Sequence, residues 1–429
     1  MQISIEELYS IYLKHRVIST DSRQILPGSL FFALKGDNFD GNKYAITALN
    51  AGAAYAVIDD ETHAGSNTLL VNDVLEALQK MALLHRRKFN IPVVAVTGSN
   101  GKTTTKELIN IVLSQQYQVT ATKGNLNNHI GVPLTLLGIT SETQIAIIEM
   151  GANHQLEISR LCQLAEPTHG LITNIGRAHL GGFGGFEGVI KAKSELYTWL
   201  RQSDGTVFVN SGNPLLMDLT TGMNRMLYGS DEGIQTRGKA RSNTSTLKLE
   251  WFSGNEKITI QTNLVGNYNF ENVMAAICIG TFFAVPPDKI KSAITSYKPS
   301  NSRSQAMRTA KNSIILDAYN ANPTSMQLAI ENFRSIQAPY KMVILGDMLE
   351  LGDESPGEHM AIVNLVKESG FDRAIFVGPD FKKAASERFP CFSSSDEALE
   401  WLQKEQIKDF TILVKGSRGI KMEKVLDAL

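Results

Sequence analysis

The sequence predicts a mixed α/β protein of three domains. These are a small α/β N-terminal domain, a central P-loop domain built on a parallel sheet, and a C-terminal Rossmann-like domain. The first observation behind this prediction is length, because 429 residues exceed what one ordinary hydrophobic core supports. The second is that strand-like runs alternate with helical patterns along most of the chain. The third is a pair of proline-containing breaks, near residue 92 and near residue 299, which divide the chain.

The first domain is predicted to cover residues 1–88. Its apolar runs are short and bounded by turn residues, as in β-strands, and a stretch with apolar residues at helical spacing follows them. The predicted strands are Ser29–Leu34, Tyr55–Ile58 and Thr68–Val71, and the predicted helix is Val74–Lys88. Pro92 then interrupts the pattern before the next strand begins, which favours a boundary there.

The central domain is predicted to cover residues 89–302. Strands separated by helical patterns indicate a largely parallel sheet, with strands at Val93–Val96, Ile145–Glu149, Gly170–Thr173 and Thr206–Val209. Residues 229–263 are more polar and alternate in character, which predicts antiparallel strands added to that sheet. Two helices are predicted to follow, at Asn272–Phe283 and Pro287–Ser296.

The C-terminal domain is predicted to cover residues 303–429, after a linker at Lys298–Ser302. Each of its four apolar runs is followed by a helical pattern, which is typical of a Rossmann-like unit. The predicted strands are Ser313–Asp317, Met342–Leu345, Arg373–Val377 and Phe410–Val414.

Composition narrows the range of functions. The formal net charge is -1, so no overall field favours nucleic acid or acidic lipid. The three cysteines are far apart, which is typical of free thiols in a reducing compartment. The first residues lack the apolar core of a signal peptide, and no apolar run is long enough to span a membrane. We therefore expect a cytoplasmic protein without membrane insertion, with a monomer as the default.

The strongest local signal is the segment VVAVTGSNGKTTTKEL, residues 93–108. A strand leads into a glycine-rich turn, and a helix follows, so backbone N–H groups can surround an anion. Lys102 is placed to reach the β- and γ-phosphates of a nucleotide, and the Thr103 hydroxyl to ligate Mg²⁺. A strict Walker A motif has glycine where this chain has Val96, so the spacing is a shorter variant. The alternative is an ordinary strand–helix turn that contains Gly-Lys-Thr by chance.

Three further side chains follow successive predicted strands, where open α/β sheets bind ligands. Glu149 ends one strand, His179 lies after the next, and Lys193 lies on the helix beyond it. A carboxylate and an imidazole in these places can hold Mg²⁺ against a triphosphate. Taken singly, Glu149 is more typical of a solvated strand end, His179 of a capping or packed histidine, and Lys193 of a surface lysine. Their joint order favours the metal site.

The ordered motifs TGSNGKTT, EMGANH, TNIGRAHLGGFG and AKSELY resemble the central domain of the Mur ligases of bacterial cell-wall synthesis. Segments outside that domain narrow the resemblance to the branch that adds D-alanyl-D-alanine. Residues 21–45 resemble the family's site for the UDP-muramoyl group, and residues 123–137 resemble its segment for the peptide substrate. The C-terminal segments that match are 316–326, 344–352 and 414–423.

The resemblance implies an activity, its cofactors and a set of site residues. The activity would join D-alanyl-D-alanine to UDP-N-acetylmuramoyl-tripeptide through an acyl-phosphate, using ATP and two Mg²⁺ ions. Lys102, Glu149, His179, Lys193 and Arg303 would be catalytic, and Lys193 would carry a carbamate derived from CO₂ that serves as an anionic metal ligand. The ATP-binding residues would be Gly98, Ser99, Asn100, Gly101, Lys102, Thr103, Thr104, Asn269, Asn272, Arg303 and Asp317. Metal would be held by Thr103, Glu149, His179 and Lys193, and the two peptide substrates by Ser22, Arg23, Asn125, Asn127, Asn128, Asn320 and Asn322.

The chain departs from the family pattern at two positions. Tyr268 stands where the family often has histidine, and Ser302-Arg303 stands where it often has Gly-Arg. The sequence Asp-Asn-Pro-Arg, typical of the branch that selects diaminopimelate, is absent, which favours the branch that adds the dipeptide. The third residue of the peptide substrate, lysine or diaminopimelate, stays open.

Two other functions compete with this one. A folylpolyglutamate synthase is an amide ligase of the same superfamily, but it has no need of a segment like DSRQILPG at residues 21–28. A non-catalytic nucleotide switch accounts for the phosphate loop, but not for the order of Glu149, His179 and Lys193. We also expect the C-terminal domain to close over the site about the 298–305 linker, because an acyl-phosphate must be protected from water.

Overall fold

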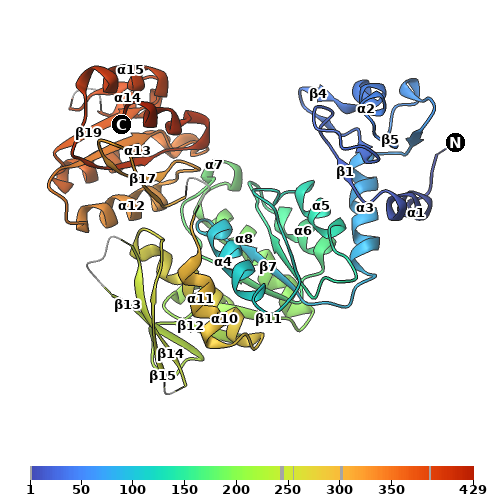
Figure 1. Cartoon of the computed structure of the whole chain (residues 1–429), viewed down its shortest axis with the longest axis horizontal. Coiled ribbons are helices and arrows are strands. Elements are labelled where there is room, and N and C mark those ends of the chain that lie inside the picture. Colours follow the sequence, from blue (N-terminus) through green and yellow to red (C-terminus); the bar gives the residue numbers. More distant parts are fainter. Residues whose placement is uncertain (1, 242–245, 255, 300–302, 386–387) are drawn as a thin grey trace. The chain divides into compact units, whose positions relative to one another are not determined.

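The computed structural model describes residues 2–241, 246–254, 256–299, 303–385 and 388–429 (Figure 1). The chain forms two compact units, each made of several segments. The first unit comprises Met1–Ala95, Gln118–Gly151 and Glu157–Thr168, and the second comprises Val96–Tyr117, Ala152–Leu156 and His169–Leu429. Part of the predicted linker, residues 300–302, lies outside the described residues, and so does Ser302 of the Ser-Arg departure.

The first unit begins with a four-stranded parallel sheet in the order β1-β2-β5-β6. Phe31 pairs with Ala56 across the centre of this sheet, and small residues of α2 pack on it. The elements of this part are α1 (Ile5–Lys14), β1 (Ile18–Ser19), β2 (Leu30–Phe32), β3 (Lys35–Gly36), β4 (Phe39–Asp40), η1 (Gly41–Tyr44), α2 (Ala45–Asn50), β5 (Tyr55–Ile58), η2 (Glu61–His63), β6 (Thr68–Leu70) and α3 (Val74–Arg86).

Helix α3 connects this sheet to the rest of the first unit, because it packs against α1, α5 and α6. Strands β8 and β9 pair in parallel, with Thr120 opposite Ala146. The elements here are β8 (Val119–Ala121), α5 (Gly131–Leu137), β9 (Ile145–Glu149) and α6 (Glu157–Ala165). Every residue of β9 is buried, which is typical of a strand covered on both faces.

The second unit contains the phosphate loop and a sheet that changes from parallel to antiparallel. Strand β7 (Val93–Thr97) ends in this unit and leads to α4 (Lys102–Leu113). Strands β10 to β13 pair in parallel in chain order, and β13, β14 and β15 pair antiparallel. The elements are β10 (His169–Ile172), α7 (Leu180–Phe183), α8 (Phe186–Gln202), β11 (Thr206–Asn210), α9 (Pro214–Leu219), β12 (Asn224–Gly229), β13 (Thr236–Arg241), β14 (Lys248–Ser253), β15 (Glu256–Gln261), η3 (Asn267–Asn269), α10 (Phe270–Phe282) and α11 (Pro287–Ser296).

The C-terminal part of the second unit has its own six-stranded sheet, in the order β16-β17-β21-β18-β19-β20. All of its pairs are parallel except the edge pair β16–β17, and the strands lie among α12 to α15 (Figure 1, orange to red). The elements are β16 (Gln305–Arg308), β17 (Ser313–Asp317), α12 (Pro323–Ser335), β18 (Lys341–Gly346), η4 (Gly352–Glu354), α13 (Ser355–Ser369), β19 (Arg373–Val377), α14 (Pro379–Ala385), β20 (Cys391–Phe392), α15 (Ser395–Glu405), β21 (Thr411–Lys415), η5 (Arg418–Ile420) and η6 (Met422–Ala428).

The predicted fold class, a mixed α/β protein with parallel sheets, is confirmed. The antiparallel strands predicted within 229–263 are present as β13, β14 and β15. Among the described residues, seven strands were not predicted: β1, β3, β4, β8, β12, β20 and the edge strand β16. The last strand, β21, is followed by two 3-10 helices rather than by an α-helix. The domain boundaries at 88/89 and 302/303 stay a prediction.

Candidate functional site: a phosphate loop and the residues around it

The loop between β7 and α4 depends on two glycines in the left-handed region of backbone conformation. Gly98 has a φ of 141° and Gly101 has a φ of 80°. A Cβ atom at Gly98 would lie 2.1 Å from Thr173 Oγ1, and one at Gly101 would lie 2.5 Å from Asn272 Oδ1. Larger residues are therefore excluded at both positions, by backbone conformation and by space. The result is a tight turn that aims the first N–H groups of α4 outward, as anion binding requires.

Asn100 is the most connected residue of this loop. Its N–H donates to Asn174 Oδ1 at 3.0 Å, and its carbonyl accepts from Thr173 Oγ1 at 2.6 Å and from Asn174 Nδ2 at 3.1 Å. Ser99 is fixed in the same way, because its hydroxyl donates to Gly176 O and its N–H donates to Asn174 O. The segment after β10 therefore sets the conformation of the phosphate loop.

Lys102 lies at the first position of α4 and folds back over the loop. Its Nζ donates to Gly98 O at 2.6 Å and to Ser99 O at 3.2 Å. The next two residues, Thr103 and Thr104, are buried, with 3% and 8% of their surface exposed. A cation and two hydroxyl groups thus lie at the N-terminus of a helix, where negative charge is stabilised.

Asn269 and Asn272 support the loop from the adjoining helix α10. Asn272 Oδ1 accepts from Thr105 Oγ1 at 3.0 Å, and its Nδ2 donates to Asn269 Oδ1 at 2.9 Å. Asn269 Nδ2 donates in turn to Val265 O at 2.8 Å. Both residues were predicted to bind ATP, and Asn272 lies against Gly101, where an added Cβ atom would be 2.5 Å from its Oδ1.

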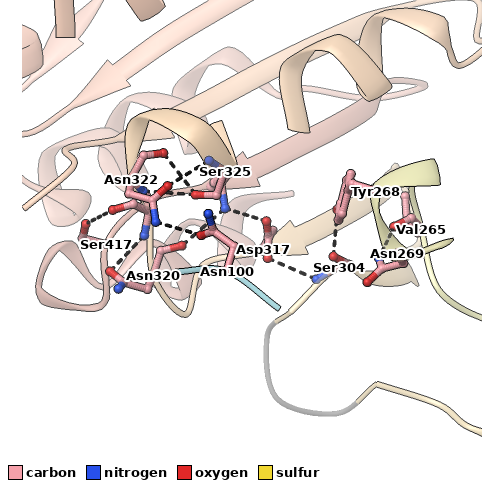
Figure 2. A network of polar contacts seen from close by, with 12 residues as sticks. Asn100, Val265, Tyr268, Asn269, Ser304, Asp317, Asn320, Asn322, Ser325 and Ser417 are labelled. Carbon is pink, nitrogen blue, oxygen red and sulfur yellow. Dashed lines mark hydrogen bonds and ion pairs between the residues drawn. The ribbon is translucent and has the colours of Figure 1, made fainter. Parts of the chain in front are cut away.

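The C-terminal residues predicted to bind ATP or substrate reach the same region (Figure 2). Asn322 caps α12 by accepting from Ser325 N, and its Nδ2 donates to Asn100 Oδ1 at 2.8 Å. Asp317 accepts from Ser304 N at 3.2 Å and from Lys415 Nζ at 2.6 Å. Asn320 lies beside them, and its carbonyl accepts from the same lysine. Asn322 thereby ties the start of α12 to the phosphate loop, and Asp317 ties the end of β17 to Ser304 and Lys415.

Tyr268 and Arg303 lie where the sequence departs from the family pattern. Tyr268 shares a hydrogen bond of 2.7 Å with the Ser304 hydroxyl (Figure 2), and burial raises its pKa above the usual range. The Arg303 guanidinium stacks 3.7 Å above the ring of Tyr319, and Arg418 lies 5.6 Å from the same ring. Such stacking holds a guanidinium in place without neutralising it, so the charge stays available to a phosphate.

His179 and Lys193 are brought together by one aromatic ring. Lys193 is 1% exposed, and its Nζ lies 5.1 Å above the ring of Phe183, which also packs edge-on against His179. Lys193 Nζ contacts Ala152 O at 3.5 Å, three residues after Glu149 in the chain. His179 has a φ of 53°, and its Nδ1 pairs with Glu350 Oε2. The close pairing with His179 lowers the pKa of the Glu350 carboxyl.

Glu149 belongs to the first unit, at the end of β9, and is 1% exposed. Its Oε1 accepts from Asn127 Nδ2 at 2.8 Å, so a predicted metal ligand and a predicted substrate residue lie in direct contact. Asn128 Oδ1 accepts from the N–H of Gly131, the first residue of α5, at 2.9 Å, and Asn125 is exposed.

Ser22 and Arg23 lie in the turn before β2, far along the chain from the other candidates. Arg23 pairs with Asp21 at 2.8 Å, and this hydrogen bond holds the pKa of the Asp21 carboxyl at about 2. Arg23 is exposed, so its guanidinium is accessible to a ligand.

Several residues of the site were not predicted from the sequence. They are Thr173, Asn174, Tyr319, Glu350 and Lys415. Thr173 and Asn174 lie at the carboxyl end of a predicted strand, and this position is a signal that could have identified them. Glu350 follows no predicted strand end so directly, and it has no such local signal.

The geometry fits a nucleotide. Asn100 Nδ2 and Arg303 Nε are buried, and within the described part of the chain they have no hydrogen-bond partner. Buried polar groups are normally paired, so these two donors fit a ligand that supplies acceptors. With the cradle formed at Gly98 and Gly101, the fold and the site define a P-loop protein of the α/β class that binds a nucleoside phosphate.

Comparisons with known proteins identify the family. Residues 96–280 match the model of the Mur ligase middle domain, residues 302–418 that of the Mur ligase, glutamate ligase domain, and residues 14–89 that of the Mur ligase family, catalytic domain. A curated relative from Bacillus subtilis, UDP-N-acetylmuramoyl-tripeptide--D-alanyl-D-alanine ligase, is 35% identical over 96% of this chain and 92% of its own. The chain therefore belongs to the Mur ligase family, whose members are ATP-dependent ligases, and the resemblance seen in the motifs is confirmed.

Solved structures agree with this assignment. A crystal structure of MurF from Acinetobacter baumannii has a TM-score of 0.86 at 32% identity and covers 96% of this chain and 92% of that one. MurF ligase from Thermotoga maritima in complex with ADP has a TM-score of 0.85 at 26% identity and covers 97% of each chain. Among the described residues, no helix is both long and apolar enough to cross a membrane.

Proposed function

We propose that this chain is an ATP-dependent ligase that joins D-alanyl-D-alanine to UDP-N-acetylmuramoyl-tripeptide in the synthesis of peptidoglycan precursors. The likeness at 35% identity over 96% of the chain to a relative of that name carries the proposal. The substrates are small molecules, and the protein acts in the cytoplasm as a monomer. The three domains, 1–88, 89–302 and 303–429, bind the UDP-muramoyl group, ATP and the incoming dipeptide respectively.

The chemistry begins with an attack by the terminal carboxylate of the tripeptide on the γ-phosphorus of ATP. The bond from that phosphorus to the bridging oxygen of ADP breaks, and an acyl-phosphate forms. Lys102 exchanges the carbonyls of Gly98 and Ser99 for phosphate oxygens and stabilises the charge that develops on them. Arg303, held over Tyr319, supplies a second cation.

The second step is attack by the amine of D-alanyl-D-alanine on the acyl carbon. A tetrahedral species forms, the amine loses a proton, and phosphate leaves. Water must be excluded between the two steps, because an acyl-phosphate hydrolyses readily. The hydrogen bond from Asn322 to Asn100 joins the C-terminal sheet to the loop and supports such closure.

The proposed ligands of two Mg²⁺ ions are Thr103, Glu149, His179 and a carbamate on Lys193. Mg²⁺ prefers oxygen ligands. Thr103 would contribute a hydroxyl and Glu149 a carboxylate, both of them buried, and His179 would contribute an imidazole. A carbamate on Lys193 would replace a buried cation with two anionic oxygens. When bound, the metal ions neutralise phosphate charge and polarise the transferring group.

Phosphate release tests the proposed function. The protein is mixed with ATP, Mg²⁺, the muramoyl tripeptide and D-alanyl-D-alanine, and in a parallel reaction with folate and glutamate in place of the last two. We expect phosphate only in the first reaction. Phosphate release in the second alone would establish the folylpolyglutamate activity instead, and ATP binding without release in either would establish a switch.

The carbamate has its own test. Lys193→Ala should lose activity, and short-chain carboxylic acids should restore part of it by supplying the missing carboxylate. A Lys193→Ala protein with normal activity would remove this lysine from the site.

A further inference from the structure

The turn after β18 meets the segment after β10 through a row of ion pairs. We call residues 347–354 the acidic turn. Glu350 pairs with His179 Nδ1, and Glu354 pairs with the guanidinium of Arg177. The same guanidinium also pairs with Glu358 of α13 at 2.8 Å. Arg177 and His179, which are two positions apart in the sequence, thus each have an acidic partner from the region of the C-terminal sheet.

The backbone on both sides of the His179–Glu350 pair is strained. His179 has a φ of 53° and Glu350 a φ of 68°, and neither residue is glycine. Such conformations cost about 1–3 kcal/mol each and persist where the surroundings require them, most often at functional sites. The acidic turn also lies close to the segment after β10, because a Cβ atom at Gly352 would lie 3.3 Å from the Cα atom of Gly181.

Hydrogen bonds of buried residues hold the acidic turn in place. Asp347, which is fully buried, accepts from the N–H groups of Asp380 and Phe381 at 3.0 and 2.8 Å. Met348 N donates to His359 Nε2 at 3.1 Å, and His359 Nδ1 lies 2.7 Å from Ser355 O. The two ring nitrogens of His359 are thus engaged by the backbone, which argues against a metal ion in the cluster of Asp347, His359 and Asp380. The hydrogen bonds of this cluster instead hold in place the turn that carries Glu350.

We infer that Glu350 is a positioning residue for His179, and this inference rests on the proposed role of His179 as a metal ligand. A carboxylate on one ring nitrogen fixes the tautomer and the orientation of an imidazole, so that the other nitrogen faces the metal. Glu350 engages Nδ1, and this contact leaves Nε2 to be presented to a divalent cation. The C-terminal region would then complete the metal site indirectly, through an imidazole that belongs to the central region.

Mn²⁺ is the probe, because its binding is measured by electron paramagnetic resonance without turnover. Free Mn²⁺ is titrated against the full chain with ADP present. Glu350→Ala should weaken Mn²⁺ binding by about tenfold or more, the effect expected when the carboxylate partner of a metal-binding histidine is lost. Glu350→Gln keeps an acceptor oxygen and should retain part of the affinity.

Glu354→Ala is the matched control, because it removes an ion pair of the same turn without touching His179. It should bind Mn²⁺ within about twofold of the unmodified protein, as expected for an exposed ion pair. Unchanged binding in Glu350→Ala would overturn the inference, and so would an equal loss in Glu354→Ala. Thermal unfolding shows whether each variant folds, and if Glu350→Ala does not, Glu350→Gln decides.

The phosphate-release assay on the unmodified protein separates this inference from the proposed function. A protein that releases phosphate with the muramoyl substrates, but whose Mn²⁺ affinity does not depend on Glu350, refutes the inference alone. A protein without that activity refutes the proposed function, and the Mn²⁺ titrations still decide the role of Glu350.

Discussion

The phosphate loop, residues 97–104, is held by neutral, partly buried hydrogen bonds, whereas the acidic turn holds residues 177–183 by ion pairs near the surface. Asn174 and Thr173 fix the backbone of Asn100 at distances of 2.6 to 3.1 Å. In contrast, Arg177 and Glu354 keep 48% and 40% of their side-chain surface exposed. Salt screening weakens exposed ion pairs, whereas hydrogen bonds between neutral groups depend little on salt concentration. The loop is therefore a permanent part of the site, and the acidic turn is a contact that can be released.

The largest effect should come from the cation of the loop. Lys102→Ala should lower the rate of phosphate release by about 10²–10⁴, because it removes charge stabilisation from the transferring phosphoryl group. Lys289→Ala is a suitable control, since Lys289 also donates its Nζ to a backbone carbonyl, that of Gln115, on the surface. Lys289→Ala should release phosphate at the rate of the unmodified protein. Equal rates in both variants would show that Lys102 has no part in the chemistry.

The second prediction separates backbone strain from close approach within the loop. Gly101 and Gly233 both have a φ of 80°. A Cβ atom at Gly101 would lie 2.5 Å from Asn272 Oδ1, whereas one at Gly233 would meet nothing within 4 Å. Both alanine variants should lose about 1 kcal/mol of unfolding free energy from strain. Only Gly101→Ala should also lose ADP affinity, by about tenfold or more, since Asn272 must move.

Denaturant unfolding and calorimetric titration with ADP measure these two quantities. If Gly233→Ala weakened ADP binding as much as Gly101→Ala, the approach of Asn272 to the loop would be irrelevant to the nucleotide.

The phosphate loop was predictable from the sequence because its signal is local. One strand, one glycine-rich turn and one helix follow each other within sixteen residues, from Val93 to Leu108. Backbone conformation and helix start are both set by neighbours in the chain, so Gly101 and Lys102 have the predicted places. The strand Ser313–Asp317 and the helix Pro287–Ser296 were predictable for the same reason, since apolar spacing and Pro287 mark them.

The acidic turn was not predictable, because its contacts join residues that are far apart. Glu350 lies more than a hundred residues after His179, and nothing in the spacing of either segment connects them. The hydrogen bond between Asn100 and Asn322 also joins residues that are far apart in the sequence, so it was not predictable either. Strand β16 was missed for another reason: Gln305–Arg308 is a short edge strand, partly exposed and without the β-branched residues that mark a strand.

The third prediction concerns the residue that fixes Asn100. Asn174→Ala removes the acceptor for Asn100 N and one donor to its carbonyl, and each such bond contributes about 1 kcal/mol. ADP binding should weaken by about tenfold, because the loop must then be ordered by the ligand itself. Asn224→Ala loses a comparable side-chain contact, to Asp204 on the surface, and should bind ADP normally. Normal ADP binding by Asn174→Ala would mean that the loop keeps its conformation without this support.

The smallest effect should come from the acidic turn, and it should depend on salt. Arg177→Ala removes the ion pairs with Glu354 and Glu358, and its expected cost is about 0.2–1 kcal/mol of unfolding free energy, since both partners of the first pair are largely exposed. In 1 M salt the difference from the unmodified protein should disappear, because the Debye length falls to about 3 Å. Denaturant midpoints at 0.05 and 1 M salt measure this difference in unfolding free energy. Asn174→Ala is the comparison, because its loss of stability should not depend on salt. A large loss in Arg177→Ala that persisted in high salt would mean that this contact is as permanent as the loop, and the distinction between the two regions would fail.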